Sequence, residues 1–271
     1  MQLRNRKIKN KLNNLSGKEW IKFTKSWFIH RPPKREKEEM LHPAKFPETL
    51  VKEFIEFFTK ENEYVLDPFA GTGSTLIAAC LSNRNSVGVE IMEKYKAIAE
   101  KRVKNTIEET KAKVSCEVIL GDSRELSKLV GERKFDYCIT SPPYWNQLKR
   151  NSIRQMERKN MGLDTRYGEK KEDIGNIDSY HDFLIEQKKV FSEVHKVMKN
   201  GGYLTIITNN VFYNGRLYPL AFDTLTMLSD IWIPKDEKIW CQDDKALLPL
   251  GIYNAWVGNR HHEYCLNFRK E

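Results

Sequence analysis

Residues 64–75 read YVLDPFAGTGST, which predicts a strand, a tight turn and the start of a helix. The strand is expected over residues 64–67 and the helix from Ser74 to residue 82. Gly71 and Gly73 allow the backbone to turn sharply and to approach a ligand closely. The free amides at a helix N-terminus bind a carboxylate or a phosphate. Phosphate is disfavoured here, because the lysine of a phosphate-binding loop and the third glycine of a dinucleotide-binding loop are both missing.

Strands and helices continue to alternate on both sides of this stretch. Helices are predicted over residues 48–59, 93–109, 180–199 and 217–228, and further strands over residues 86–90, 116–120, 135–140, 203–208, 238–240 and 263–268. This alternation is typical of a mostly parallel sheet with helices on both faces. We therefore predict an α/β fold with a mostly parallel, seven-stranded sheet, and we expect its ligands beyond the carboxyl ends of the strands.

Acidic residues end the two strands that come next. Glu90 ends the strand over residues 86–90, where a carboxylate can bind both hydroxyls of a ribose. Asp122 and Ser123 follow the strand over residues 116–120, where an adenine edge is expected. Each acid alone is also explained as a solvated residue at a strand end. Together with the glycine loop, they indicate a cofactor that contains a nucleoside.

The sequence TSPPY, residues 140–144, follows the strand over residues 135–140 and is the most specific motif in the chain. Its two prolines hold the backbone in an extended geometry and supply no N–H group. A Pro-Pro turn after a buried strand is the alternative explanation, but it leaves the glycine loop upstream unexplained.

Several motifs resemble those of the N4-cytosine/N6-adenine DNA methyltransferases. SPPY is similar to the family's catalytic tetrapeptide, DPFAGTGST (67–75) to its cofactor loop, and VGVE (87–90) to its ribose-binding strand. HPAKFP (42–47) resembles the segment that lies beside the methionine moiety of the cofactor, and HHEYCLNFR (261–269) the closing strand. The resemblance covers residues 42–271 and implies a Rossmann-like fold of the S-adenosylmethionine-dependent methyltransferases.

The resemblance also implies the site. The residues expected to bind S-adenosylmethionine are His42, Ala44, Phe46, Asp67, Phe69, Gly71, Gly73, Ser74, Thr75, Glu90, Asp122, Ser123 and Thr140. The catalytic residues expected are Ser141, Pro142, Pro143 and Tyr144. Ser141 Oγ and the carbonyl of Pro142 are expected to accept hydrogen bonds from an exocyclic amine, which raises the nucleophilicity of its nitrogen. Tyr144 is expected to stack on a base that has left the duplex.

Serine at the first position of the tetrapeptide is more usual in this family for cytosine N4, and Asp or Asn for adenine N6. We therefore expect a site-specific enzyme that methylates the N4 of cytosine in double-stranded DNA. Methylation of adenine N6, methylation of RNA, and binding of nucleic acid by an inactive methyltransferase fold are the alternatives. The missing third glycine disfavours a nicotinamide-dependent oxidoreductase. A cognate restriction endonuclease is a further candidate partner.

The positive charge of the chain is concentrated in two segments. The 271 residues carry a net charge of +9. Residues 1–40 contain twelve Lys or Arg against four Glu, and residues 146–172 contain eight Lys or Arg against four acids, so the remainder is slightly acidic. This distribution indicates a polyanionic partner that contacts both segments. Solvated, lysine-rich tails and loops are the alternative explanation.

We expect a basic N-terminal arm over residues 1–40 and a methyltransferase domain over residues 41–271. Within the domain, the basic insert over residues 146–178 is expected to contact DNA and to recognise its target. The DNA-binding residues expected there are Lys149, Arg150, Arg154, Arg158, Lys159 and Arg166. The basic arm with its aromatic residues Trp20, Phe23, Trp27 and Phe28 is the second candidate for target recognition, but we expect these aromatics to pack on the domain.

Composition disfavours several other classes of protein. No stretch approaches the roughly 18 apolar residues of a membrane helix, and no apolar region follows the basic N-terminus as in a secretory signal. The five cysteines are widely spaced and form no CxxC pair. His261, His262 and Glu263 are neighbours on a predicted strand, so their side chains alternate between faces and no metal site is expected. We expect a cytoplasmic, nucleoid-associated protein of a prokaryote.

Overall fold

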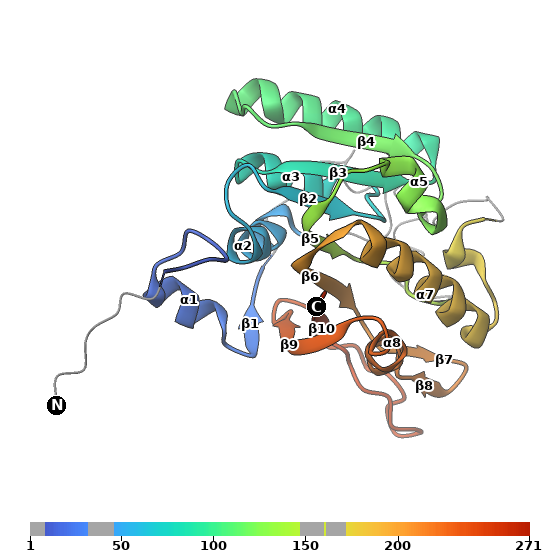
Figure 1. The fold of residues 1–271 in the computed structure, drawn as a ribbon. Coiled ribbons are helices and arrows are strands. Elements are labelled where there is room, and N and C mark those ends of the chain that lie inside the picture. The colour runs from blue at the N-terminus through green and yellow to red at the C-terminus, as the bar shows by residue number, and fades with distance from the viewer. Residues whose placement is uncertain (1–8, 32–45, 147–159, 161–171) are drawn as a thin grey trace.

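The computed structural model describes residues 9–31, 46–146, 160 and 172–271. Within these residues an eight-stranded sheet has the order β1-β9-β10-β6-β5-β2-β3-β4 (Figure 1). Its strands are β1 (Trp27–Ile29), β2 (Tyr64–Asp67), β3 (Asn85–Glu90), β4 (Cys116–Leu120), β5 (Phe135–Thr140), β6 (Met198–Thr208), β9 (Ile233–Cys241) and β10 (His262–Arg269). The helices are α1 (Gly17–Phe23), α2 (Glu48–Phe58), α3 (Ser74–Leu81), α4 (Glu93–Thr110), α5 (Leu126–Val130), α7 (Tyr180–Val197) and α8 (Leu220–Leu228).

The sheet is mostly parallel. β2 pairs in parallel with β3 and β5, and the same direction continues to β4 and β6. β10 is antiparallel to both β6 and β9. The carboxyl ends of the central strands therefore meet at one edge of the sheet, where ligands bind in folds of this kind.

Successive residues of the central strands point to opposite faces of the sheet. Leu66 and Ile206 belong to the apolar cluster that also contains residues of α5, α7 and α8. Val65 and Ile207, their neighbours in sequence, pack in a second cluster with α2 and α3. Because both faces are covered by helices, the sheet is buried and the ligand must bind at its edge.

The prediction of seven strands is wrong by one. The additional strand is β1, which pairs in parallel with β9 and lies at the edge of the sheet. Its three residues are too few to show a period in the sequence. The side chains of Trp20, Phe23 and Phe28 pack against the cluster around α2, as expected. Trp27 is nearly half exposed, with the Lys25 ammonium 3.3 Å from the centre of its ring, so packing on the domain was wrong for this residue.

Two helix boundaries differ from the sequence prediction by more than one residue. The helix expected over residues 217–228 begins at Leu220, because the preceding residues form a hairpin of β7 (Val211–Tyr213) and β8 (Arg216–Tyr218) and Pro219 precedes the first turn. The helix expected to end at residue 199 ends at Val197, where β6 begins. In both places residues expected at one end of the helix form part of a strand instead. That strand is hydrogen-bonded to residues outside the helix.

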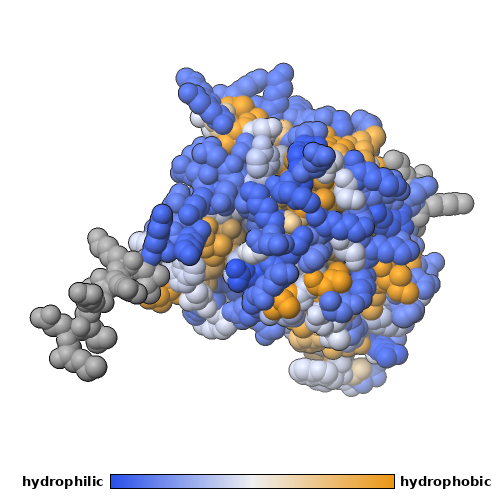
Figure 2. Space-filling view, viewed as in Figure 1, coloured by the Kyte–Doolittle hydropathy of each residue, from blue (hydrophilic) through white to orange (hydrophobic). Residues whose placement is uncertain are grey.

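The face of the molecule in Figure 2 is mainly hydrophilic, with small hydrophobic patches between hydrophilic residues. Among the described helices, none is both long and apolar enough to cross a lipid bilayer.

Candidate active site

Hydrogen bonds to the side chain of Asp67 stabilise the glycine-rich loop between β2 and α3. The carboxylate of Asp67 is fully buried and accepts hydrogen bonds from the backbone amide of Phe69 (2.9 Å) and from the hydroxyls of Thr75 (2.5 Å) and Thr140 (2.6 Å). Burial raises the pKa of this carboxyl group, while the three hydrogen bonds act in the opposite direction. Asp67 thus ties the loop to α3 and to the end of β5.

These three polar side chains were predicted to bind the cofactor. In the structure Asp67, Thr75 and Thr140 bind one another inside the protein, and none of them lines the cleft described below. The hydroxyl of Ser74 is likewise engaged, because it donates to Glu48 Oε1 at 2.7 Å. The geometry gives these side chains a role in shaping the loop.

The glycines of the loop meet backbone requirements that other residues do not satisfy easily. Gly71 has φ 53° and Gly73 has φ 85°, in the left-handed region. A Cβ atom on Gly73 would lie 3.0 Å from the Cβ of Ala99, so the glycine also lets α3 begin close to α4. The amide of Gly71 donates to Glu90 Oε2 at 2.8 Å, which joins the loop to the end of the neighbouring strand.

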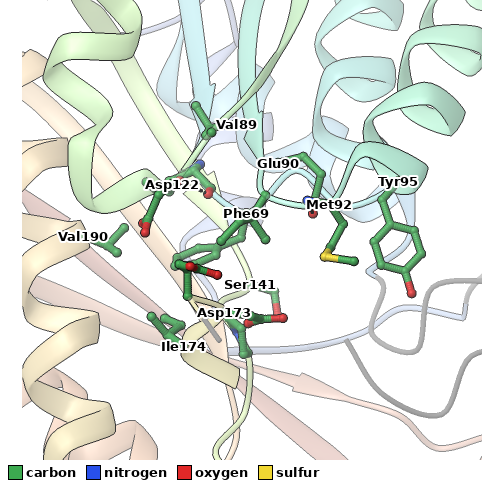
Figure 3. A pocket seen from close by; sticks show the side chains of 16 residues that line it. Phe69, Val89, Glu90, Met92, Tyr95, Asp122, Ser141, Asp173, Ile174 and Val190 are labelled. Atoms are coloured by element: carbon green, nitrogen blue, oxygen red, sulfur yellow. Dashed lines mark hydrogen bonds between the residues drawn. The ribbon is translucent and has the colours of Figure 1, made fainter. Parts of the chain in front are cut away.

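Glu90 lies at the end of β3 and lines the cleft (Figure 3). Its second carboxylate oxygen accepts a hydrogen bond from the amide of Met92 at 2.8 Å. Burial raises the pKa of Glu90 to about 7, in spite of these two hydrogen bonds, and the nearby carboxylates of Asp173 and Asp67 add to the increase. A carboxyl group with such a pKa is half ionised near neutral pH.

The cleft at the carboxyl edge of the sheet has a volume of about 600 Å³, part of which is open to solvent. Residues that line it, several of them labelled in Figure 3, include Pro68, Phe69, Val89, Glu90, Met92, Tyr95, Asp122, Ser123, Ser141, Pro143, Asp173, Ile174 and Val190. Apolar walls together with carboxylates and a serine fit an adenosine group, whose ring is flat and whose ribose offers two hydroxyl donors.

The structure therefore brings Phe69, Glu90, Asp122 and Ser123 together with Ser141 and Pro143, as expected from the sequence. Met92, Tyr95, Asp173, Ile174 and Val190 also line the cleft and were not predicted. No motif marks them, because most of them follow a long insert or lie inside a helix. The positions of Asp173, Ile174 and Val190 depend on how α7 and the segment before it pack over the strand ends.

Asp122 differs from a free strand-end acid. It caps the short helix over Ser123–Glu125, and its carboxylate is bound by the Arg124 guanidinium at 3.0 Å and 3.1 Å from Nε. Burial alone would raise the pKa of Asp122, but the hydrogen bonds with Arg124 lower it below the usual value. Arg124 also binds Glu186 (2.6 Å) and the carbonyl of Glu172 (2.9 Å), which attaches one wall of the cleft to α7.

The SPPY motif leaves the end of β5 and places Ser141 and Pro143 on the cleft. Ser141 Oγ lies 3.1 Å from the hydroxyl of Tyr144, and this hydroxyl lies 2.7 Å from Glu263 Oε2. The ring of Tyr144 is buried beside Trp145 and does not line the cleft. Its predicted role as a stacking surface for a base stays a prediction. The contact with Glu263 was not predicted.

Several predicted site residues are not in the cleft or lie outside the described residues. His42 and Ala44 belong to the undescribed part, as do all six predicted DNA-binding residues: Lys149, Arg150, Arg154, Arg158, Lys159 and Arg166. Phe46 is described, and it packs in the cluster around α2. Among the described residues, no group of three or more His, Cys, Asp or Glu side chains is arranged to hold a metal ion.

The sheet order and the position of the cleft define the chain as a Rossmann-like methyltransferase fold, and solved structures share it. The structure titled NSun6 from Pyrococcus horikoshii with SFG has a TM-score of 0.52 at 13% sequence identity, and the match covers 88% of this chain and 56% of that one. A putative rRNA-methylase from Clostridium thermocellum has a TM-score of 0.51 at 14% identity, with 84% of this chain and 99% of that one covered. At this identity the likeness shows the fold alone.

Residues 2–101 and 135–271 match the model of the N6/N4 DNA methylase family. The chain therefore belongs to this family, whose cofactor is S-adenosylmethionine, and the resemblance seen in the motifs is confirmed.

Curated relatives match over shorter segments. The orphan methyltransferase M.BamHII of Bacillus amyloliquefaciens is 36% identical over 104 residues, which cover 37% of this chain and 39% of that protein. The putative methylase YubD of Escherichia coli (strain K12) is 45% identical over 62 residues, 23% of this chain and 27% of that protein. The chain thus spans well under half the length of these relatives in the matched segments.

Proposed function

We propose that this protein transfers a methyl group from S-adenosylmethionine to the exocyclic N4 of cytosine in double-stranded DNA. The observation that supports the proposal most directly is that Ser141 and Pro143 of the SPPY motif line the same cleft as Glu90. A group that receives a methyl and the cofactor that supplies it must meet in one place. A binding protein with an inactive fold has no need for this arrangement.

The SPPY loop supplies the chemistry that an exocyclic amine requires. When bound, S-adenosylmethionine supplies a methyl group on a positively charged sulfur. The lone pair of the amine is conjugated with the ring of the base and is a poor nucleophile. Hydrogen bonds accepted by Ser141 Oγ and by the carbonyl of Pro142 favour a tetrahedral nitrogen, and the loop holds that nitrogen in line with the methyl group. The base must leave the duplex to reach this position.

Glu90, Asp122 and Ser123 are the residues proposed to hold the nucleoside part of the cofactor. Glu90 would accept hydrogen bonds from the ribose hydroxyls, and Phe69 and Val190, which line the same cleft, would contact the adenine. Asp122 acts together with Arg124, since its carboxylate is already paired. Glu90 and Asp122 therefore act as parts of hydrogen-bonded networks.

Cytosine is preferred over adenine in this proposal because position 141 is a serine. A neutral hydroxyl accepts a hydrogen bond from the amine without adding a negative charge to the cleft, and the smaller pyrimidine needs a shallower pocket. Mass spectrometry of nucleosides from DNA incubated with the enzyme and cofactor is the direct test, and we expect N4-methylcytosine. N6-methyladenine without N4-methylcytosine would contradict the choice of base and leave the reaction class intact. Methylated RNA with unmodified DNA would overturn the choice of polymer.

Ser141→Ala is expected to lower kcat about ten- to a hundredfold, because the missing acceptor matters most in the transition state. Cofactor and DNA affinities are expected to stay close to those of the wild type. The matched control is Ser26→Ala, which removes an exposed hydroxyl remote from the cleft in sequence and is expected to change nothing. Wild-type turnover in the Ser141 variant would mean that Ser141 only helps to form the turn and has no catalytic role.

A further inference from the structure

Two hydrogen bonds connect Ser141 to a residue on a different strand. Ser141 Oγ is 3.1 Å from the Tyr144 hydroxyl, which is 2.7 Å from Glu263 Oε2 on β10. The other carboxylate oxygen of Glu263 accepts from Gln242 Nε2 at 3.3 Å. Gln242 directly follows β9, so the chain of contacts runs from the end of β5 across the carboxyl edge of the sheet.

The chemistry of the three groups decides which of them donates. A carboxylate has no proton to give, so the Tyr144 hydroxyl donates to Glu263. The carbonyl of Ile207 competes for the same proton, but it is a neutral acceptor at the longer distance of 3.4 Å. A phenol has a single proton. Ser141 must therefore be the donor in its contact with Tyr144, and its hydroxyl proton points away from any group that approaches Ser141 from the cleft.

This direction matters for methyl transfer to an amine. A serine hydroxyl that rotates freely can also donate its proton to the lone pair of the amine nitrogen. That lone pair has to form the new bond to carbon, so such a contact blocks the reaction. A hydroxyl whose proton is held by Tyr144 presents only its lone pairs, and it can only accept from the N–H groups of the substrate.

We propose that Glu263 is a positioning residue that, through Tyr144, fixes Ser141 as a hydrogen-bond acceptor for the target amine. The proposal rests on the proposed function, because it concerns the same site. It also gives the hydroxyl of Tyr144 a role in addition to that of its ring. Gln242 contributes by donating to the carboxylate from the opposite side, which holds Glu263 in place.

Glu263→Gln tests the proposal, since the amide has nearly the same shape but can donate as well as accept. The proton of Tyr144 is then no longer directed, and we expect kcat to fall at least about tenfold while KM for the cofactor changes less than about twofold. Tyr144→Phe keeps the ring and is expected to lower kcat by a similar factor. Glu237→Gln, the same change at an exposed position of β9, is the control and is expected to be silent.

Double variants separate this role from a purely structural one. If Glu263 acts through Tyr144 and Ser141, Glu263→Gln lowers kcat no further in the Tyr144→Phe or the Ser141→Ala background. An undiminished fall in kcat in either background would overturn the proposal, because Glu263 would then act by another route. Unfolding midpoints of all variants should lie near that of the wild type.

Raman difference spectra of wild type minus Tyr144→Phe provide a readout that does not depend on turnover. The tyrosine doublet should have the intensity ratio of a strong donor, and this signature should disappear in the Glu263→Gln background. A wild-type spectrum without the donor signature overturns the proposal. A wild-type enzyme that methylates no DNA overturns the proposed function and this proposal with it, whereas normal turnover in Glu263→Gln overturns the proposal alone.

Discussion

The carboxylate of Glu90 accepts hydrogen bonds from the amides of Gly71 and Met92, yet burial raises its pKa to about 7 from an ordinary value of 4.5. Between these two values the folded protein binds a proton that the unfolded chain has already released. The contribution of Glu90 to the free energy of unfolding is therefore most favourable below about pH 4.5 and decreases as the pH rises through 7. The protein keeps an acid where ionisation costs stability, which is typical of functional sites.

Cofactor affinity is expected to rise with pH through this range. The ionised carboxylate accepts hydrogen bonds from ribose hydroxyls more strongly than the protonated form does. If only the ionised form binds, the dissociation constant should fall about tenfold between pH 6 and pH 8, with release of a proton below pH 7. Isothermal titration calorimetry in two buffers with different ionisation enthalpies measures both quantities.

Glu90→Gln is the control for this pH dependence, because its amide is neutral throughout. The cofactor affinity of this variant should be weaker than that of the wild type and should not change between pH 6 and pH 8. Exposed Glu93, three residues further along, offers a matched change that should leave the wild-type profile intact. Equal wild-type affinity at both pH values would contradict the assignment of Glu90 to the ribose.

At the scale of elements, α1 and β1 extend the domain beyond its predicted sheet. The ring of Phe23 stacks on Phe57 of α2 with centroids 4.0 Å apart, and Trp20 lies 4.8 Å from the same ring. Lys238 of β9 donates to the backbone carbonyls of Phe23 and Lys25, so β9 also holds the segment between α1 and β1. Part of the basic N-terminal segment therefore has a structural role.

Phe23→Ala should lower the free energy of unfolding by about 1–3 kcal/mol, less than for a fully buried aromatic residue because Phe23 is only partly buried. Ile21→Ala on the same helix is the control, since Ile21 is 73% exposed and should change stability by less than about 0.5 kcal/mol. Denaturant titration followed by circular dichroism compares the two. Equal midpoints for both variants would mean that this segment does not stabilise the domain.

At the scale of the whole molecule, the net charge of +9 is unevenly distributed. Residues 1–40 and 146–172 carry the excess, and the remaining chain is slightly acidic. Of these two segments the structure describes residues 9–31, 146, 160 and 172, so the placement of the basic insert remains a prediction. A chain with such a distribution is expected to bind a polyanion through the two segments and to repel it elsewhere.

DNA affinity should therefore fall steeply with salt concentration. Replacing Arg150, Arg154 and Arg158 by Gln should reduce the slope of log K against log salt by roughly 0.9 for each phosphate that is no longer neutralised. The control removes the same charge from exposed Lys101, Lys104 and Lys111 around α4. Fluorescence anisotropy at several salt concentrations gives the slopes. A wild-type slope near zero, or equal slopes for both triple variants, would mean that the basic segments are solvated and do not contact DNA phosphates.

The sequence alone determined the local elements and the chemistry of the motifs. The strands Tyr64–Asp67, Cys116–Leu120 and Phe135–Thr140 have the predicted bounds, because the hydrophobic pattern of a buried strand and the glycines or prolines that end it are local signals. The same signals placed Glu90 and Ser141 at strand ends, and parallel strands then bring both to one edge.

Only the tertiary structure decided which polar side chains face the cleft and which ones bind other groups of the protein. Asp67 is bound by Thr140, 73 residues away, and Tyr144 by Glu263, 119 residues away. Whether a carboxylate faces a cleft or a neighbouring hydroxyl depends on the order of the strands and on which helix covers them. That order results from pairing between distant segments, such as β1 with β9, and no local pattern in the sequence records it.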